Sequence, residues 1–285
     1  MLLVINKINF IFFSVVKVIF KIFSLFIFML CFHFASSFKR QTPFLFLLKQ
    51  NYNDKKIITL SPGGFRGFYV LGLCKYIKEN YDLTDYVFSG ASAGAWNSLF
   101  LSYNGNTDKF VDSVMSVDIK KQSSLYNVQQ NMKDTLLEFF VESDFDFEKL
   151  HIGTTIFKNF RFHPIIYSDF NNLEDAIDCC IASSHIPFIT GRFKYNYRGI
   201  NSYDGGFVEF PYLNNEYSSI HITPSIWNPE ESTLEKIKKR KKRLSDYSTL
   251  FNKDGHNIKE LYLNGYEDAE KNKDKLNKMF DNNNK

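Results

Sequence analysis

Cysteine is scarce in this chain of 285 residues, and the four that are present form no recognisable framework. Cys31 lies in an apolar N-terminal segment, Cys74 falls on the apolar side of an expected helix, and Cys179 and Cys180 are adjacent. Neither a disulfide-rich scaffold nor a zinc site uses such spacing. The sequence therefore predicts that the globular part resides in a reducing compartment.

An excess of one charge is also missing, because 35 Lys and Arg are balanced by 31 Asp and Glu, which leaves a net charge of +4. We expect no nucleic acid partner from so small an excess. The local exception is Lys236–Arg243, with seven cations in eight residues. This cluster is either a solvated helix face, a site for anionic lipid head groups or a nuclear-localisation-like patch. Because an apolar N-terminal segment is also present, we favour the interpretation that this cluster binds anionic lipid head groups.

Linkers rich in proline, glycine and serine are absent from the sequence, which has 7 Pro, 14 Gly and no internal repeat. This length and a hydrophobic content of 44% suit one sizeable globular domain with appendages. We expect an apolar segment over 1–40, the globular domain over 52–226, and a basic helical extension over 227–285. The Asn/Lys/Asp-rich end, 271–285, has the composition of a frayed tail.

Long uncharged apolar runs are confined to the N-terminus, where Met1–Phe38 is interrupted only by Lys7, Lys17 and Lys21. Ile22–Phe38 gives 17 residues without Asp, Glu, Lys or Arg, near the lower limit for a transmembrane helix. A cleaved signal peptide, an uncleaved anchor and an interfacial amphipathic helix are all compatible with this pattern. We favour a membrane anchor with the globular domain in the cytosol, and keep secretion as the alternative.

The few glycines are concentrated in motifs, and Gly90-Ala91-Ser92-Ala93-Gly94 is the most informative. It follows a short aromatic and β-branched run at 85–88 and precedes a helical pattern at 93–101. A strand, a tight turn and a helix are the setting of the G-x-S-x-G nucleophile elbow, in which Gly90 and Gly94 flank an exposed serine hydroxyl. The alternative is a purely structural glycine-rich turn.

A second glycine-rich segment, Ser61–Gly67, lies between an expected strand at 56–60 and an expected helix from Gly67 to Tyr81. The amides of Gly63 and Gly64 suit an oxyanion hole, supported by the positive end of the following helix. Arg66 could order the loop or contact a substrate phosphate. A phosphate-binding loop fits poorly, because the G-K-[ST] ending is absent.

A serine nucleophile needs a base, and none of the six histidines lies in a motif that marks a catalytic triad. Asp204 is the stronger candidate, because Gly205 and Gly206 follow it at the end of a hairpin-like run. An ordinary β-turn is the alternative explanation of Asp-Gly-Gly. His185, just beyond an expected helix at 173–183, is the rival base.

These motifs occur in a telling order: Gly-Gly-x-Arg-Gly, Gly-x-Ser-Ala-Gly, the stretch Ala182–Phe188, and then Asp-Gly-Gly. In this order and spacing the chain resembles the patatin-like phospholipase family over about 55–224. The resemblance implies an α/β three-layer fold with a mainly parallel central sheet flanked by helices. It also implies an acyl hydrolase domain over 52–226.

The resemblance assigns a role to each matching residue. Ser92 would be the nucleophile of a Ser-Asp dyad, and Asp204 would accept its proton directly. The residues that match the oxyanion-hole loop are Gly63, Gly64, Arg66 and Gly67. Pro62 departs from the family pattern, because it replaces a glycine and removes an N–H donor.

The resulting hypothesis is a lipid acyl hydrolase of the phospholipase A type, which uses no metal or other cofactor and takes membrane lipids as substrate. Two alternatives remain: a catalytically silent, membrane-tethered scaffold, and an acyltransferase with the same dyad. The rest of the sequence predicts strands near 154–157, 162 and 165–167 in the centre of the sheet, and a last strand at 220–223. It also predicts a helical stretch over 120–147, whose apolar cluster is either core or a lid.

Overall fold

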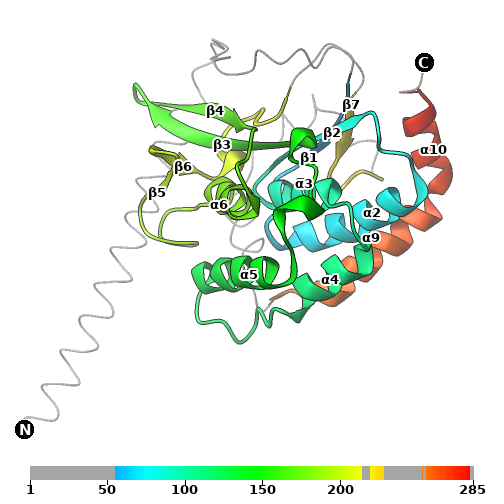
Figure 1. Ribbon diagram of the computed structural model, residues 1–285, viewed down its shortest axis with the longest axis horizontal. Coiled ribbons are helices and arrows are strands. Elements are labelled where there is room, and N and C mark those ends of the chain that lie inside the picture. The colour runs from blue at the N-terminus through cyan, green and yellow to red at the C-terminus, as the bar shows by residue number, and fades with distance from the viewer. Residues whose placement is uncertain (1–54, 214–218, 228–251, 253–254, 283–285) are drawn as a thin grey trace, which may run out of the picture. The chain divides into compact units, whose positions relative to one another are not determined.

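The computed structural model describes residues 55–213, 219–227, 252 and 255–282, and the structural statements below concern these residues. Seven strands form one sheet (Figure 1). The strands are β1 (Lys56–Leu60), β2 (Tyr86–Ala91), β3 (Leu150–Lys158), β4 (Arg161–Tyr167), β5 (Tyr195–Tyr197), β6 (Ile200–Tyr203) and β7 (Ser219–Ile222). The α-helices are α2 (Gly67–Asn80), α3 (Ala93–Ser102), α4 (Thr107–Ser116), α5 (Leu125–Phe139), α6 (Leu173–Ser183), α9 (Ile258–Lys271) and α10 (Lys273–Asn282).

The sheet has a parallel part and an antiparallel part. Its order is β5-β6-β3-β2-β1-β7, and β4 pairs with β3 off this path. The pairs β1–β7, β1–β2 and β2–β3 are parallel, whereas β3–β4, β3–β6 and β5–β6 are antiparallel. Strands that are parallel need helical crossovers, which is why β1 and β2 are each followed directly by a helix. The expected α/β fold with a central parallel sheet flanked by helices is confirmed.

Strand β3 connects the two parts, because both of its edges are paired. β4 pairs with 152–158 of β3 along one edge. β2 pairs with 150–153 of β3, and β6 pairs with 155–156. Both of these pairings overlap that of β4, so β2 and β6 must lie along the opposite edge of β3, one beyond the other. The carboxyl ends of β2 and β6 therefore approach each other.

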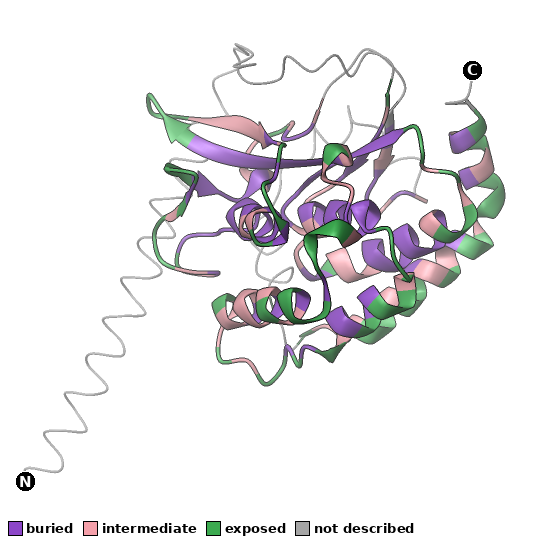
Figure 2. Ribbon diagram, in the orientation of Figure 1, coloured by how far each residue is buried: buried purple, intermediate pink, exposed green. Residues whose placement is uncertain are grey.

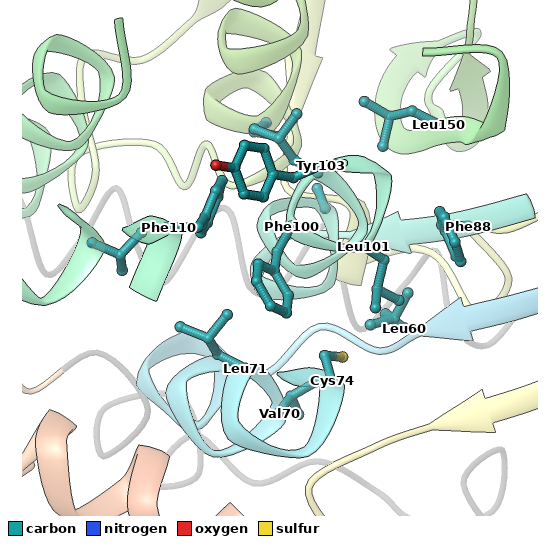
Figure 3. Close-up of a cluster of buried hydrophobic side chains, with 14 of the residues drawn as sticks. Leu60, Val70, Leu71, Cys74, Phe88, Phe100, Leu101, Tyr103, Phe110 and Leu150 are labelled. Carbon is teal, nitrogen blue, oxygen red and sulfur yellow. The ribbon is translucent and has the colours of Figure 1, made fainter. Parts of the chain in front are cut away.

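The main core lies between one face of the sheet and the helices. Alternate strand residues such as Ile58, Leu60 and Phe88 are buried in one cluster with side chains of α2 and α3. Figure 3 shows Phe100 of α3 above Val70 and Leu71 of α2, with Leu60 and Phe88 approaching from the strands. Each buried aliphatic or aromatic side chain contributes about 1.5–3 kcal/mol. The sheet centre is accordingly almost wholly buried (Figure 2).

The C-terminal helices belong to this packing. Helix α9 lies side by side with α2 (Figure 1). Gly72 permits the contact, because a Cβ there would lie 2.0 Å from the backbone carbonyl oxygen of Tyr262. Helix α10 buries Leu276 and Phe280, and the Phe280 ring stacks on Tyr81. The expectation of a frayed tail over 271–285 was therefore wrong for 273–282. Two apolar residues four positions apart are enough to give this polar segment a buried face.

Other expectations were met in part. The last expected strand is present as β7, and α5 occupies the middle of the stretch 120–147. The apolar cluster of that stretch is divided: Leu136 and Phe140 are core, while Phe139 and Val141 are exposed. Strand β4 is not central, because among the described strands it pairs only with β3.

The segments on which the expected membrane attachment depends lie outside the described residues. The predicted anchor over 1–40 and the cationic cluster Lys236–Arg243 both belong to these segments. Within the described part of the chain, no helix combines the length and the apolar character needed to cross a bilayer.

Candidate active site

Ser92 stands at the turn between β2 and α3, as the G-x-S-x-G motif predicted. Its backbone has φ 53° and ψ −123°, a region that a residue with a Cβ rarely adopts. Such a conformation costs about 1–3 kcal/mol and persists only where the surroundings enforce it. The turn brings the serine to the carboxyl end of the parallel strands and to the amino end of α3. We call residues Gly90–Gly94 the elbow.

The two glycines of the elbow are required by close contacts. A Cβ on Gly90 would lie 2.1 Å from the carbonyl oxygen of Gly94. A Cβ on Gly94 would lie 2.1 Å from the carbonyl oxygen of Leu60 in β1. Because these obstacles are backbone atoms, no rotation of a side chain could relieve them. The glycines therefore allow the elbow to lie directly against β1.

Ser92 and Asp204 meet, although 112 residues separate them in the sequence. The Ser92 hydroxyl donates a hydrogen bond to Oδ2 of Asp204, with 2.7 Å between the oxygens. Both residues are buried, with 2% of Ser92 and 4% of Asp204 exposed. A carboxylate at this distance can accept the hydroxyl proton when the serine oxygen attacks an electrophile.

The carboxylate of Asp204 is held on both sides. Its Oδ1 accepts a hydrogen bond of 2.7 Å from the amide of Gly206, which leaves Oδ2 for the serine. The Asp204 amide donates to the carbonyl oxygen of His185, also at 2.7 Å. Through the bond from the Gly206 amide, the Asp204 side chain caps the short 3-10 helix η4 (Gly205–Phe207). The Asp-Gly-Gly motif is a turn, but one that fixes the orientation of a buried carboxylate.

The strand arrangement explains why these two residues meet. β2 runs parallel to β3 and ends with Ala91 opposite Gly153, while β6 runs antiparallel and ends with Tyr203 opposite Thr155. The two chains run toward each other along one edge of β3 and stop on either side of Thr154. Ser92 and Asp204 are the next residues of the respective chains. The site is the gap between two strand ends.

Gly205 fits into this gap. A Cβ on Gly205 would lie 2.6 Å from the carbonyl oxygen of Gly153 and 2.7 Å from Cβ of Ala91. Atoms from β2, β3 and the turn after β6 are therefore in contact at one point. Only a residue without a side chain permits this approach.

Ser183 is a residue of the site that sequence reasoning did not single out. Its hydroxyl accepts a hydrogen bond of 2.8 Å from the amide of Ser92 and donates one of 2.6 Å to the carbonyl oxygen of Gly153. Ser183 is the last residue of α6 and is fully buried. The stretch Ala182–Phe188 contained the signal, but no periodicity or spacing assigns it this contact. Ser183 ties the elbow to β3 and α6.

The glycine-rich loop lies beside the elbow, because β1 and β2 are paired with Leu60 opposite Gly90. A 3-10 turn η1 (Gly64–Arg66) leads into α2, and the Cβ position of Gly67 lies 2.7 Å from Cβ of Ala93. Among the described residues, the amides of Gly63 and Gly64 donate no hydrogen bond to the protein. These amides are thus available to a ligand at the amino ends of α2 and α3, where the helix dipoles are positive.

The loop also contains Pro62 and Arg66, whose side chains have other roles than the glycine amides. Pro62 lies against the turn after Asp204, since its Cβ is 3.1 Å from the Cβ position of Gly206. Proline supplies no donor, so its contribution is packing beside the carboxylate. Arg66 is exposed at the start of α2. Its guanidinium is therefore accessible to a soluble or lipid-borne anion.

The surroundings of Asp204 are largely apolar, as Tyr203 and Tyr212 are buried and Phe207 is half-buried. Burial raises the pKa of Tyr212, and the negative charge of Asp204 raises it further. The phenol therefore stays neutral beside the carboxylate. Few water molecules reach a carboxylate in such surroundings, which strengthens its interaction with the serine.

His185, the rival base, is buried next to the site but faces elsewhere. Its ring packs against Tyr195 and Tyr203 and lies 3.2 Å from the Cβ position of Gly191. Burial lowers the pKa of His185, although hydrogen bonds with the backbone at 192–193 act in the opposite direction. The Ser92 hydroxyl donates to Asp204 and not to this ring. In the described residues no group of three or more His, Cys, Asp or Glu could hold a metal ion.

Comparisons with known proteins give one matching family. The family model described as patatin-like phospholipase matches residues 58–213, more than half of this chain. The chain is 26% identical over 163 residues to the omega-hydroxyceramide transacylase of Homo sapiens. That match covers 53% of this chain and 30% of the relative, so the chain spans less than a third of its length.

Two solved structures also align with the chain. VipD from Legionella pneumophila has a TM-score of 0.34 and 14% sequence identity, and the match covers 59% of this chain and 50% of VipD. The heterodimeric ExoU–SpcU complex from Pseudomonas aeruginosa has a TM-score of 0.32 and 11% identity. That match covers 75% of this chain and 52% of the aligned chain.

Proposed function

This chain belongs to the patatin-like phospholipase family, and we propose that it cleaves carboxylic ester bonds of lipids through an acyl-enzyme on Ser92. The observation that supports this proposal most directly is the hydrogen bond of 2.7 Å from the Ser92 hydroxyl to Asp204. A strained serine with a carboxylate in hydrogen-bond contact has the two parts that nucleophilic catalysis needs. The family membership supports a lipid as the substrate.

In the proposed reaction, the Ser92 oxygen attacks the ester carbonyl while its proton passes to Oδ2 of Asp204. The tetrahedral intermediate collapses, the bond to the alcohol oxygen breaks, and the proton leaves with that alcohol. The acyl group remains on Ser92 as an ester. Water then attacks this ester with Asp204 again accepting a proton, which returns to the serine when the fatty acid departs. Asp204 acts as base and acid without a histidine.

The oxyanion of each tetrahedral intermediate would be stabilised by the amides of Gly63 and Gly64. Both amides lack a protein partner in the described residues and stand at the positive ends of two helices. Preorganised donors of this kind typically contribute about 3–4 kcal/mol each to catalysis. Gly67 serves this loop through its close contact with Ala93. We assign Arg66 to the phosphate of a phospholipid, because its side chain is exposed beside the loop.

Transfer of the acyl group to a lipid hydroxyl is a second candidate function. It is favoured by the name of the human relative, a transacylase. Transfer and hydrolysis share every step up to the acyl-enzyme and differ only in which oxygen attacks it.

The proposal includes attachment to a membrane through segment 1–40, with the catalytic domain in a reducing compartment. The free, buried thiols of Cys74, Cys179 and Cys180 support the compartment.

The test uses the full chain, a fluorophosphonate probe and mixed phospholipid vesicles. Wild type is expected to be labelled and to release free fatty acid. Ser92→Ala should lose both, and Asp204→Asn should reduce release about a thousandfold. Ser102→Ala is the matched control, because the hydroxyl of this buried serine bonds to the Leu99 carbonyl oxygen within its own helix, α3. The control should behave as wild type.

Other outcomes would change the assignment. Release that survives Asp204→Asn would make another residue the base, and His185 would be tested next. Appearance of the acyl group on an added lipid alcohol, in place of free fatty acid, would identify a transacylase. A folded wild type that is neither labelled nor active would contradict the proposal and leave a lipid- or protein-binding scaffold.

A further inference from the structure

The turn that joins β3 and β4 contains a residue type that is unfavourable in the backbone conformation of this turn. Lys158 pairs with Arg161, so Asn159 and Phe160 form a two-residue hairpin loop. Both loop residues have positive φ, 51° and 58°, as in a type I′ turn. Such turns strongly prefer Asn-Gly, because glycine adopts positive φ without strain. Asparagine satisfies the first position, but phenylalanine occupies the second.

Packing does not compensate for this strain. The Phe160 side chain is 91% exposed, and its ring contact is with Phe157, itself exposed, with centroids 6.5 Å apart. A large apolar side chain in a strained conformation and in water stabilises neither the turn nor the core. The green tip of the β3–β4 hairpin in Figure 2 shows how far this loop stands out from the buried sheet. Phe160 therefore contributes little to the stability of the fold.

The hairpin projects beyond the carboxyl ends of the parallel strands, where Ser92 lies. β2 stops opposite Gly153, whereas β3 continues to Lys158 before it turns. The tip thus extends beyond the ends of the parallel strands by about 3.3 Å for each further residue. Phe162, just after the turn, packs its ring against Tyr203 and Phe207 on either side of the Asp204 turn. The hairpin is joined to the candidate active site by this aromatic contact.

The charges of the hairpin are of one sign. Lys158 and Arg161 are exposed at the base of the loop, and no acidic residue occurs from Gly153 to Tyr167. Exposed aromatic rings with flanking cations are the combination that inserts into the interface of an anionic bilayer.

A second loop beside the site has the same composition. Phe188 and Phe193 are exposed, and their rings lie 5.7 Å apart. Arg192 and Lys194 are exposed next to them, and the segment 186–194 contains no acidic residue. This loop follows His185, whose carbonyl oxygen holds the Asp204 amide. Aromatic rings with cations thus occur in two loops connected to the Asp204 turn.

We propose that the β3–β4 hairpin tip, Phe157–Phe162, inserts Phe160 into the surface of an anionic lipid bilayer and presents the active site to it. The loop 186–194 assists from the other side of β6. Lys158 and Arg161 contact the phosphate groups of the lipids. This inference rests on the proposed function for its purpose, since a lipid ester must reach Ser92, but the insertion itself requires no reaction.

The test places a tryptophan reporter at the tip of the full chain and another at a matched position. Phe160→Trp is compared with Leu263→Trp, because Leu263 is also exposed (46%) but belongs to α9. Each variant is mixed with vesicles of phosphatidylcholine and phosphatidylserine that contain brominated lipid. The emission of the tip reporter should shift to the blue and be quenched, while the emission of the α9 reporter should not change. Because the reporters are local, attachment through other segments does not affect the comparison.

Three further measurements complete the test. Arg161→Gln in the Phe160→Trp protein should raise the vesicle concentration for half-maximal quenching about fivefold, and only when phosphatidylserine is present. Phe160→Gly should lower the ratio of vesicle to soluble-ester hydrolysis about tenfold. Ser92→Ala combined with Phe160→Trp should still be quenched, which separates insertion from catalysis.

Absence of a blue shift and of quenching at position 160 would overturn the proposal, even if the protein is active. Equal quenching at positions 160 and 263 would overturn it as well, because contact would then not be specific to the tip. Quenching at 160 in a protein without esterase activity would uphold the insertion and contradict the proposed function instead.

Discussion

Ser92 and Asp204 come from two parts of one sheet that hold their residues in different ways. In the parallel part, which comprises β7, β1, β2 and the start of β3, every residue of β2 is buried. In the antiparallel part, β4 and β5 are half-exposed and end in loops with positive φ. The serine lies in a turn closed by backbone contacts at Gly90 and Gly94, whereas the carboxylate of Asp204 is oriented mainly by its hydrogen bonds with Ser92 and Gly206.

This difference separates rigidity from access. The parallel part can keep Ser92 in a strained conformation because α3, β1 and Ser183 surround it. The antiparallel part brings Asp204 to the same point, but its strands β4 and β5 are themselves partly exposed. Substitutions in the parallel part should therefore change the stability of the fold. Substitutions in the antiparallel part should change the properties of the surface more than the stability.

The largest effect is expected at the elbow. Gly94→Ala puts a Cβ 2.1 Å from the Leu60 carbonyl oxygen, so β1 and the elbow must separate. We expect the free energy of unfolding to fall by about 4 kcal/mol or more, the range of severe core overpacking. Chemical denaturation measures it. Gly63→Ala is the control, because its Cβ would have 3.6 Å to the nearest atom; an equal loss there would refute the steric explanation.

A smaller effect is expected from pH, through a histidine of the parallel part. Burial lowers the pKa of His151 to about 4, while the unfolded chain titrates near 6.5. The unfolded chain therefore binds more protons between these values, and stability should be lost as the pH falls from 6.5 to 4, by up to about 3 kcal/mol. His221, whose pKa burial also lowers to about 4, acts in the same direction.

Denaturation at several pH values checks this prediction. His151→Gln should flatten the dependence without abolishing it, because His221 remains. A variant with the wild-type slope would show that His151 is not the group responsible.

Ser183 ties the elbow to β3, and its loss should cost about 2 kcal/mol. Ser183→Ala leaves the buried Ser92 amide and the Gly153 carbonyl without this partner. Fluorophosphonate labelling of Ser92 should also become slower, since its strained backbone loses a support. Ser184→Ala is the matched control: its hydroxyl bonds to Trp96 and to Cys180 of α6. Equal slowing in both variants would argue against a specific role for Ser183.

The smallest effect has the opposite sign. Phe160→Gly replaces a strained residue at φ 58° by the one that this turn prefers, so the free energy of unfolding should rise by about 1 kcal/mol. Phe157→Gly, within β3, should lower it by a similar amount, because glycine weakens a strand. Thermal or chemical denaturation compares the two. Destabilisation by both would mean that Phe160 contributes to the fold.

Local signals predicted several elements closely. The strand 56–60 and the helix 173–183 were predicted with the bounds that β1 and α6 have, and the helix from Gly67 ends one residue earlier than expected. Apolar periodicity and glycine motifs depend on neighbours in the sequence, so they can be read from it. The same holds for Ser92 in its turn.

What local patterns could not predict depends on partners distant in the sequence. The meeting of Ser92 with Asp204 was expected only from the family resemblance, because it needs the registers of β2 and β6 against β3, which no local pattern records. The contacts of Ser183 have the same origin. Helix α10 was missed because a polar composition hid Leu276 and Phe280, and β4 was misplaced because an edge strand can be as apolar as a central one.

The meeting of β2 and β6 along β3 has a consequence for how the protein tolerates change in length. The separation of Ser92 from Asp204 in space is set by three residues of β3, Gly153 to Thr155, and not by the 112 positions between them in the chain. Insertions in the loops of that interval would leave the pair intact. A shift of β6 by a single residue would move Asp204 by about 3.3 Å and turn its side chain to the other face of the sheet.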